Sequence, residues 1–173
     1  MKKSTQSPLQ EKLLTSYKTE MISFIHSHPD VFNEAVELAI SDNQPFAWRA
    51  AQLLWSCMEE NDNRIRKYIP KIIDCIKTKK DGHQMQLLKI LFMMKLKEGD
   101  EAKVFDECIN IWEDINKIPS VRFNALKFII KIAKKHPDLF KEISFLAEEH
   151  YINSLSHGAK NSVLKMITRL HLN

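Results

Sequence analysis

The chain has little glycine and no long apolar run. Only three glycines occur, Gly82, Gly99 and Gly158, and none belongs to a glycine-rich phosphate-binding loop. No apolar stretch approaches the roughly 20 residues that a membrane-spanning helix needs. The N-terminus carries lysines but no apolar segment behind them, so it does not resemble a signal peptide. We therefore expect no membrane association and a cytoplasmic location.

Cysteine is equally sparse, and the chain lacks the motifs of metal and nucleophile sites. Cys57, Cys75 and Cys108 lie within apolar helical patterns and show no CxxC spacing. An odd number of such residues predicts buried free thiols in a reducing compartment. The HExxH pattern and paired Cys/His spacings of zinc sites are also missing. We predict no catalytic residue, no metal and no cofactor, and therefore a protein that is not an enzyme.

Arginine is scarce relative to lysine. The formal net charge is +4, and only five of the 26 basic residues are arginines. Proteins that read phosphates or bases rely on the planar, bidentate guanidinium of arginine. The lysine excess is more typical of a soluble surface than of nucleic-acid recognition. The basic residues nevertheless concentrate in residues 61–80, which hold seven of them against two acidic residues.

One short segment occurs twice. The residues from His28 to Glu34 read HPDVFNE, and those from His136 to Glu142 read HPDLFKE. The two copies lie 108 residues apart, which equals three steps of 36. Such self-similarity at a fixed period is the sequence signature of repeat architectures.

Apolar residues between the two copies follow nearly the same period. Each set has helical spacing, because three- and four-residue steps place side chains on one face. The first set is Ala51, Leu54, Trp55 and Met58, which 37-residue steps move onto Leu88, Leu91, Phe92 and Lys95 and then onto Ala125, Phe128, Ile129 and Ile132. The second is Phe32, Ala35, Val36 and Ala39, which maps onto Ile69, Ile72, Ile73 and Ile76 and then onto Phe105, Cys108, Ile109 and Trp112. Each unit therefore holds two helices, which we call A and B.

This register predicts an all-α fold of about nine helices. A polar tail, residues 1–9, precedes a single repeat domain, residues 10–173. Within it we expect one continuous A helix over residues 9–26 and one continuous B helix over residues 137–153. The predicted units are residues 10–42, 45–80, 83–118 and 120–154, followed by a terminal helix over residues 157–173.

The helix pairs, the prolines at helix starts and the Arg-x-x-Ala-Leu pattern of Arg122, Ala125 and Leu126 resemble HEAT repeats. The resemblance covers nearly the whole chain. The rival 34-residue tetratricopeptide pattern lacks its Trp-x-x-Leu-Gly-x-x-Tyr signature here. The resemblance implies a right-handed α-α superhelix of the armadillo type. It also implies a scaffold that binds another macromolecule on a concave face formed by B helices.

Two functions are consistent with this resemblance. The first is a non-enzymatic interaction module that binds a protein or peptide segment. The second is a nucleic-acid-binding module similar to the HEAT-like DNA alkylation-repair proteins. A glycosylase of that type needs a carboxylate and aromatic side chains that converge, whereas Trp112, Glu113 and Asp114 are consecutive and spread around their helix. The sequence therefore favours the first function.

The candidate partner-binding residues are Arg64, Lys67, Lys71 and Trp112. The three basic residues are predicted to share one face of the second B segment, where they serve either a binding groove or an ordinary solvated surface. Trp112 lies in register with the core, yet a second apolar stripe on its helix leaves either packing or a binding patch open. The predicted core consists of Leu54, Ile73, Leu88, Leu91, Phe92, Ile109, Phe128, Ile129 and Phe140.

Overall fold

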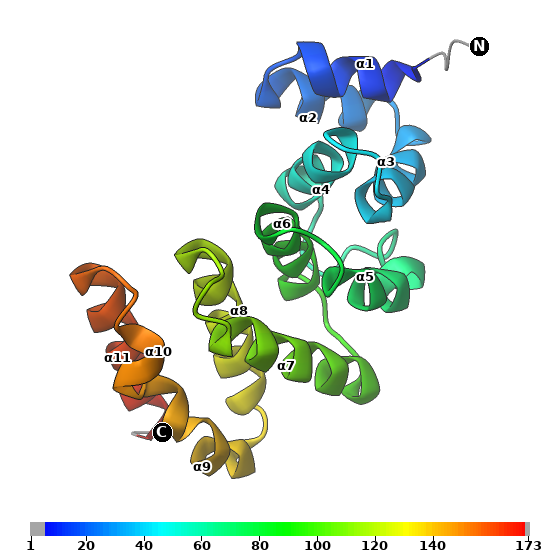
Figure 1. Cartoon of the computed structure of the whole chain (residues 1–173). Helices are drawn as coiled ribbons and strands as arrows, with labels where there is room; N and C mark the ends of the chain where they lie inside the picture. Colours follow the sequence, from blue (N-terminus) through cyan, green and yellow to red (C-terminus); the bar gives the residue numbers. More distant parts are fainter. Residues whose placement is uncertain (1–5, 172–173) are drawn as a thin grey trace. The chain divides into compact units, whose positions relative to one another are not determined.

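The computed structural model describes residues 6–171, and all regular structure within that range is helical (Figure 1). The chain divides into two compact units, residues 1–95 and 96–173. The elements of unit 1 are α1 (Pro8–Thr15), α2 (Lys18–Ser27), α3 (Val31–Ile40), α4 (Phe46–Cys57), the 3-10 turn η1 (Arg66–Tyr68), α5 (Ile69–Ile76) and α6 (Asp81–Phe92). Those of unit 2 are α7 (Glu98–Glu113), α8 (Pro119–Ala133), η2 (Pro137–Leu139), α9 (Phe140–Ile143), η3 (Ser144–Ala147), α10 (Glu149–Ile152) and α11 (His157–His171). The predicted all-α fold is confirmed.

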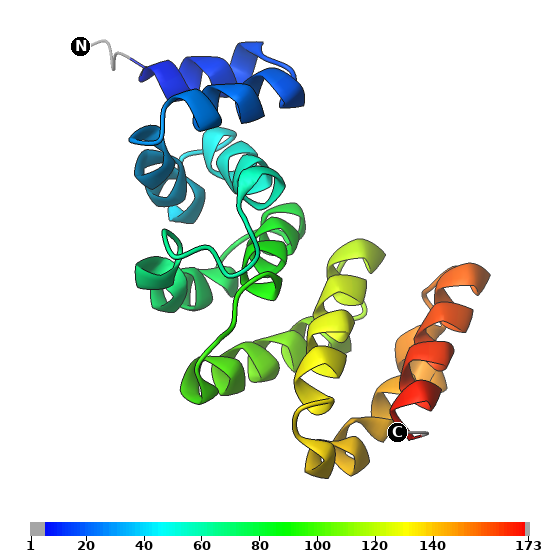
Figure 2. The ribbon, with the colours of Figure 1, turned by 180° about the vertical axis from the view of Figure 1, so that it is seen from behind.

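Unit 1 consists of two layers. The B helices α3 and α5 lie side by side in one layer, while the A helices α4 and α6 lie side by side in the other (Figures 1 and 2). The most extensive packing joins α3 to α4, and α5 packs on α6 in the same way. Each hairpin therefore combines the B helix of one predicted unit with the A helix of the next.

Unit 2 repeats this hairpin with α7 and α8, and α11 packs along α8. Its last B segment is not the continuous helix expected over residues 137–153. It breaks into η2, α9, η3 and α10, none longer than four residues. The first A segment is also interrupted, because Ser16 is extended and Tyr17 is the N-cap of α2, with its backbone N–H donating to Glu20 at 3.2 Å.

Most of the predicted core is buried, as expected for residues repeated at helical spacing. Leu54, Ile73, Leu88, Leu91, Phe128 and Ile129 are all within the buried set. Three predictions are wrong. Phe92 is 39 % exposed because it is the last residue of α6. Ile109 is only half-buried, because the short segments opposite it cover α7 incompletely, and Phe140, the first residue of α9, is half-buried as well.

Candidate partner-binding surface

The segment that carries the predicted basic site begins with a fixed turn. Asn61 adopts a left-handed conformation with φ of 58°, which asparagine tolerates better than most residues. Its backbone N–H donates to the carbonyl oxygen of Met93 at 2.8 Å. Its side-chain oxygen accepts from the backbone N–H of Lys95 at 3.1 Å and from Nη2 of Arg66 at 2.6 Å. The chain between α4 and η1 is therefore anchored to the end of α6.

Arg64 lies in this turn and is held by a buried carboxylate. Asp62 accepts from the Arg64 Nε at 3.0 Å, from its Nη2 at 2.6 Å and from its backbone N–H at 3.0 Å. The Arg64 guanidinium holds the pKa of Asp62 below its usual range, and Asp62 raises the pKa of Arg64 in return. The Arg64 Cζ also lies 3.8 Å from the ring centroid of Phe32. Arg64 thus links α3 to the turn, and its charge is compensated.

A surface hollow of about 370 Å³ lies beside Arg64. Its lining includes Cys57, whose pKa rises to about 11 because burial disfavours the thiolate. Burial likewise raises the pKa of Cys75 and Cys108. All three cysteines are free thiols, and none has the lowered pKa that activates a nucleophile. Within residues 6–171, no group of three or more His, Cys, Asp or Glu side chains converges as a metal site would require.

Lys67 and Lys71 are placed differently from Arg64. Lys67 belongs to η1 and Lys71 to α5, and both are exposed. The Lys67 ammonium lies 4.9 Å from the ring centroid of Tyr68. No carboxylate of the described residues forms an ion pair with either lysine. The three predicted basic residues therefore do not share one helix, and two of them carry uncompensated charge.

Trp112 lies in the core of unit 2 and is completely buried. Its indole N–H donates to the carbonyl oxygen of Leu146 at 3.0 Å, and the guanidinium of Arg122 lies 4.8 Å from its ring centroid. A partner cannot reach this side chain, so we leave it out of the binding surface. The sequence left open whether Trp112 packs in the core or belongs to a binding patch, and its burial agrees with packing in the core.

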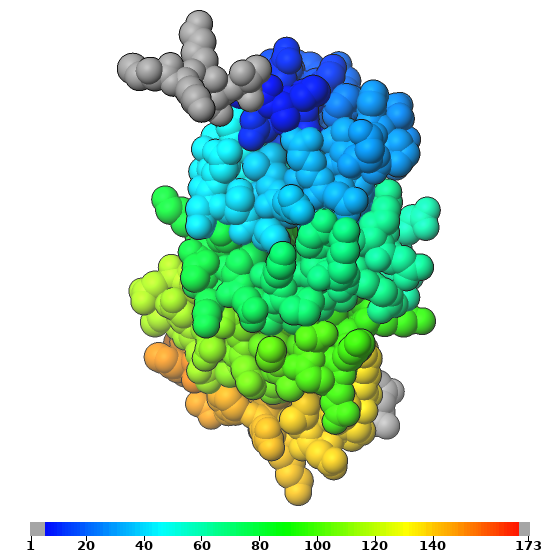
Figure 3. All heavy atoms as spheres, turned by 90° about the vertical axis from the view of Figure 1, so that its right-hand side faces the viewer, coloured from blue at the N-terminus to red at the C-terminus, as the bar shows by residue number. Residues whose placement is uncertain are grey.

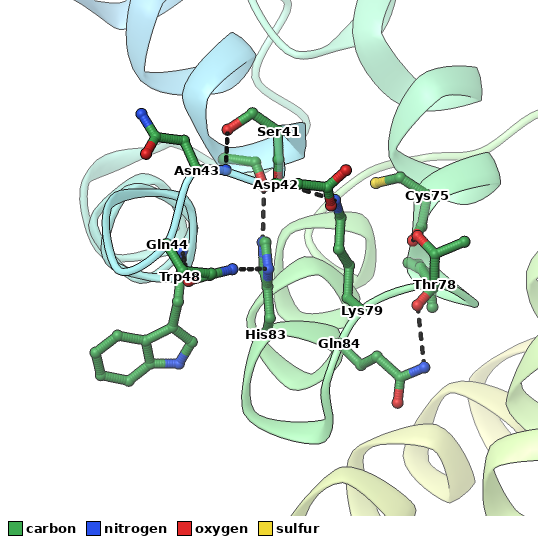
Figure 4. A network of polar contacts seen from close by, with 12 residues as sticks. Ser41, Asp42, Asn43, Gln44, Trp48, Cys75, Thr78, Lys79, His83 and Gln84 are labelled. Atoms are coloured by element: carbon green, nitrogen blue, oxygen red, sulfur yellow. Dashed lines mark hydrogen bonds and ion pairs between the residues drawn. The ribbon is translucent and has the colours of Figure 1, made fainter. Parts of the chain in front are cut away.

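A polar network joins the turn after α3 to the turn after α5 (Figure 4). It was not predicted from the sequence. The ammonium of Lys79 donates to the backbone oxygen of Ser41 at 2.9 Å and to Asp42 at 2.5 Å. Beside it, His83 Nε2 lies 2.7 Å from the oxygen of Ala39, and its Nδ1 lies 3.0 Å from Nε2 of Gln44. Only one tautomer satisfies both contacts, with Nε2 donating to Ala39 and Nδ1 accepting from Gln44. Burial accordingly lowers the pKa of His83.

The repeat period itself could have revealed such contacts. Asp42 and Lys79 are 37 residues apart, and other polar links have similar separations along the chain. Tyr68 donates to Asn33 across 35 residues, and Lys135 pairs with Glu101 across 34. Equivalent positions in consecutive repeats stack, so complementary polar residues one period apart are candidate contacts.

Comparison with known proteins agrees with this architecture. A profile of the HEAT repeat domain family matches residues 5–169. No curated protein and no solved structure matches the chain. Within residues 6–171, none of the helices has both the length and the hydropathy to cross a membrane. The match spans nearly the entire chain, and on that basis the protein belongs to the HEAT repeat family.

Proposed function

We propose that this protein is a non-enzymatic interaction module whose B-helix face binds an acidic segment of a partner protein. HEAT repeats generally mediate contacts between proteins. The binding surface that we propose is the basic face, defined here by Lys67, Lys71 and Lys77. Figure 3 views the molecule from the side on which α3 and α5 lie.

The observation that best supports this proposal is the exposed positive charge of η1 and α5. Ile69, Ile72, Ile73 and Ile76 form the buried side of α5, which leaves Lys71 and Lys77 facing solvent together with Lys67 of η1. Asp74 is the one acidic side chain on this exposed side of α5. Uncompensated lysines at a protein surface accelerate and orient the association of acidic partners.

The neighbouring helix favours a peptide over a nucleic acid. Helix α3 packs beside α5, and the Tyr68 hydroxyl donates to the side-chain oxygen of Asn33 at 3.3 Å. The exposed side of α3 carries Glu34 and Glu37. These carboxylates repel the uniform negative charge of a phosphate backbone. A peptide can instead alternate acidic with basic or neutral residues and so match both helices.

The absence of catalytic activity and the compartment are part of the proposal. The protonated state of the Cys57 thiol, with its pKa of about 11, supports a structural role for that cysteine. Three free cysteines suit the reducing cytoplasm, which is the location that we propose.

The test is a binding titration with a designed acidic peptide. The probe carries fluorescein, has Leu at three- and four-residue steps and has Glu at most other positions. The Lys67→Glu/Lys71→Glu variant replaces two attractive charges with repulsive ones. It should therefore bind the peptide about tenfold or more weakly, which corresponds to about 1.4 kcal/mol or more. Folding should be nearly unchanged, because exposed charges contribute little to stability.

The matched control is Lys134→Glu/Lys165→Glu, which makes the same change in net charge at exposed positions of unit 2. This control should retain most of the affinity. Equal losses in both variants would show that only net charge matters and would overturn the proposed surface. Duplex DNA is the second probe, and binding to it that is tighter and steeply salt-dependent would favour the nucleic-acid function instead.

A further inference from the structure

A groove in unit 2 is lined by acidic residues, in contrast to the basic face of unit 1. It is a surface hollow of about 380 Å³, within the size range of ligand-binding pockets, roughly 300–1,000 Å³. Helix α7 forms one wall, and α9 and η3 form the other. We call it the acidic groove, and its lining residues are Phe105, Asp106, Ile109, Asn110, Glu142, Ile143 and Phe145.

Its apolar surface is larger than the repeat pattern predicts. The repeat register aligns Phe105 and Ile109 with Ile69 and Ile73, which are buried in unit 1. In unit 2 both side chains remain half-exposed, as does Phe145. The difference arises because α9 and η3 have only four residues each and cover α7 incompletely. These apolar side chains are therefore available for contact with a partner.

The groove is firmly connected at its base. The indole of Trp112, on α7, donates to the oxygen of Leu146, which belongs to η3. Ile143, the one buried lining residue, is 2 % exposed. The ring centroids of Phe145 and Tyr151 lie 6.1 Å apart in an edge-on arrangement, and the Tyr151 hydroxyl donates to Glu113 at 3.5 Å. Both walls are thus held by contacts within unit 2.

The charge of the groove identifies the chemistry of its occupant. Asp106 and Glu142 line it, whereas no lysine or arginine is among the lining residues. Neither Asp106 nor Glu142 forms an ion pair with another described residue. An occupant that buries Phe105 and Ile109 must bring cations close to these carboxylates, because burying them unpaired is costly.

We propose that the acidic groove binds a basic amphipathic helix of a partner protein. Apolar side chains one helical turn apart would contact Phe105, Ile109 and Phe145, and flanking lysines or arginines would pair with Asp106 and Glu142. This surface is distinct from the basic face of unit 1, and its partner has the opposite charge. The chain then acts as an adaptor with one surface for an acidic segment and one for a basic helix.

The test uses the full chain and a fluorescein-labelled peptide with Leu at three- and four-residue steps and Lys elsewhere. The Asp106→Asn/Glu142→Gln variant removes both charges and keeps the shape of the side chains. We expect it to lower the affinity about tenfold, and we expect added salt to weaken wild-type binding. Hydrogen exchange should slow at residues 105–110 and 142–145 when the peptide is bound.

The matched control is Asp138→Asn/Glu149→Gln, which removes two exposed carboxylates outside the groove and should leave the affinity unchanged. The Lys67→Glu/Lys71→Glu variant should also bind the basic peptide at least as well as the wild type, which separates this proposal from the function of the basic face. Three results would overturn the inference. The first is an affinity for the basic peptide that is the same in Asp106→Asn/Glu142→Gln as in the wild type. The second is peptide-induced protection only in other parts of the chain. The third is a wild-type homodimer that Asp106→Asn/Glu142→Gln dissociates, because a second copy of the chain would then occupy the groove.

Discussion

Replacement of Arg122 should destabilise unit 2 more than any surface change. Its side chain is completely buried and donates to the oxygen of Trp112 at 2.9 Å, to that of Tyr151 at 2.6 Å and to the hydroxyl of Ser154 at 2.9 Å. Trp112 and Tyr151 lie in the last turns of α7 and α10, where helix carbonyls lack partners within their own helix. One guanidinium therefore joins three segments of unit 2.

The magnitude follows from the acceptors left behind. In Arg122→Met, two backbone carbonyls lose a charged donor, and each unsatisfied buried acceptor costs about 1–3 kcal/mol. Part of that loss is offset, because the folded state no longer has to bury a guanidinium. Burial lowers the pKa of Arg122, which reflects this cost. We expect a net loss of about 2–4 kcal/mol in the free energy of unfolding. The free energy of unfolding of Arg122→Lys should lie between those of the wild type and Arg122→Met, because one ammonium cannot span all three acceptors.

The assay is urea unfolding followed by the fluorescence of Trp112. Trp48 and Trp55, which lie in unit 1, are first replaced by phenylalanine so that the signal reports unit 2 alone. Arg122→Met is then compared with its parent, with the m-value checked for two-state behaviour. A loss below about 0.5 kcal/mol, the range of ordinary surface substitutions, would refute the reasoning.

Two further predictions concern unit 1. Leu91→Ala should cost about 2–5 kcal/mol in urea unfolding, because Leu91 is fully buried in α6 and the substitution leaves a cavity; a loss below about 0.5 kcal/mol would show that α6 is not central to the core. The stability that neutral His83 contributes should be complete above its unfolded pKa of about 6.5 and should decrease as the pH falls towards its lowered folded pKa. The difference in unfolding free energy between wild type and His83→Gln, measured by circular dichroism from pH 8 to pH 5, should therefore shrink with acidity, and a constant difference would contradict the lowered pKa of the buried ring.

The sequence predicted the helices well because burial imposes a period on apolar residues. Leu54, Leu91 and Phe128 recur at steps of 37 residues and are all buried. The period does not specify which neighbours form a hairpin, because each A helix has a B helix on either side in the chain. That choice depends on the turns, and the extensive packing of α3 on α4 became visible only in the structure.

The candidate site was less predictable because helical spacing was assumed where the chain is irregular. Residues 63–68 form a turn and a 3-10 segment, so Arg64 pairs with Asp62 and does not align with Lys67 and Lys71. Likewise, the register places Ile109 in the core but cannot show that the segment opposite it is broken. Both outcomes depend on local backbone geometry, which periodicity does not describe.

Hydrogen exchange of the full chain with the acidic peptide tests the central claim, that the basic face is a binding surface for a protein segment. Amide exchange is compared with and without the peptide, in the wild type and in Lys67→Glu/Lys71→Glu. We predict slower exchange in the wild type across residues 66–78, and no such change in the variant at the same peptide concentration. Protection confined to other segments, or protection of residues 66–78 that survives the double reversal, would contradict the account.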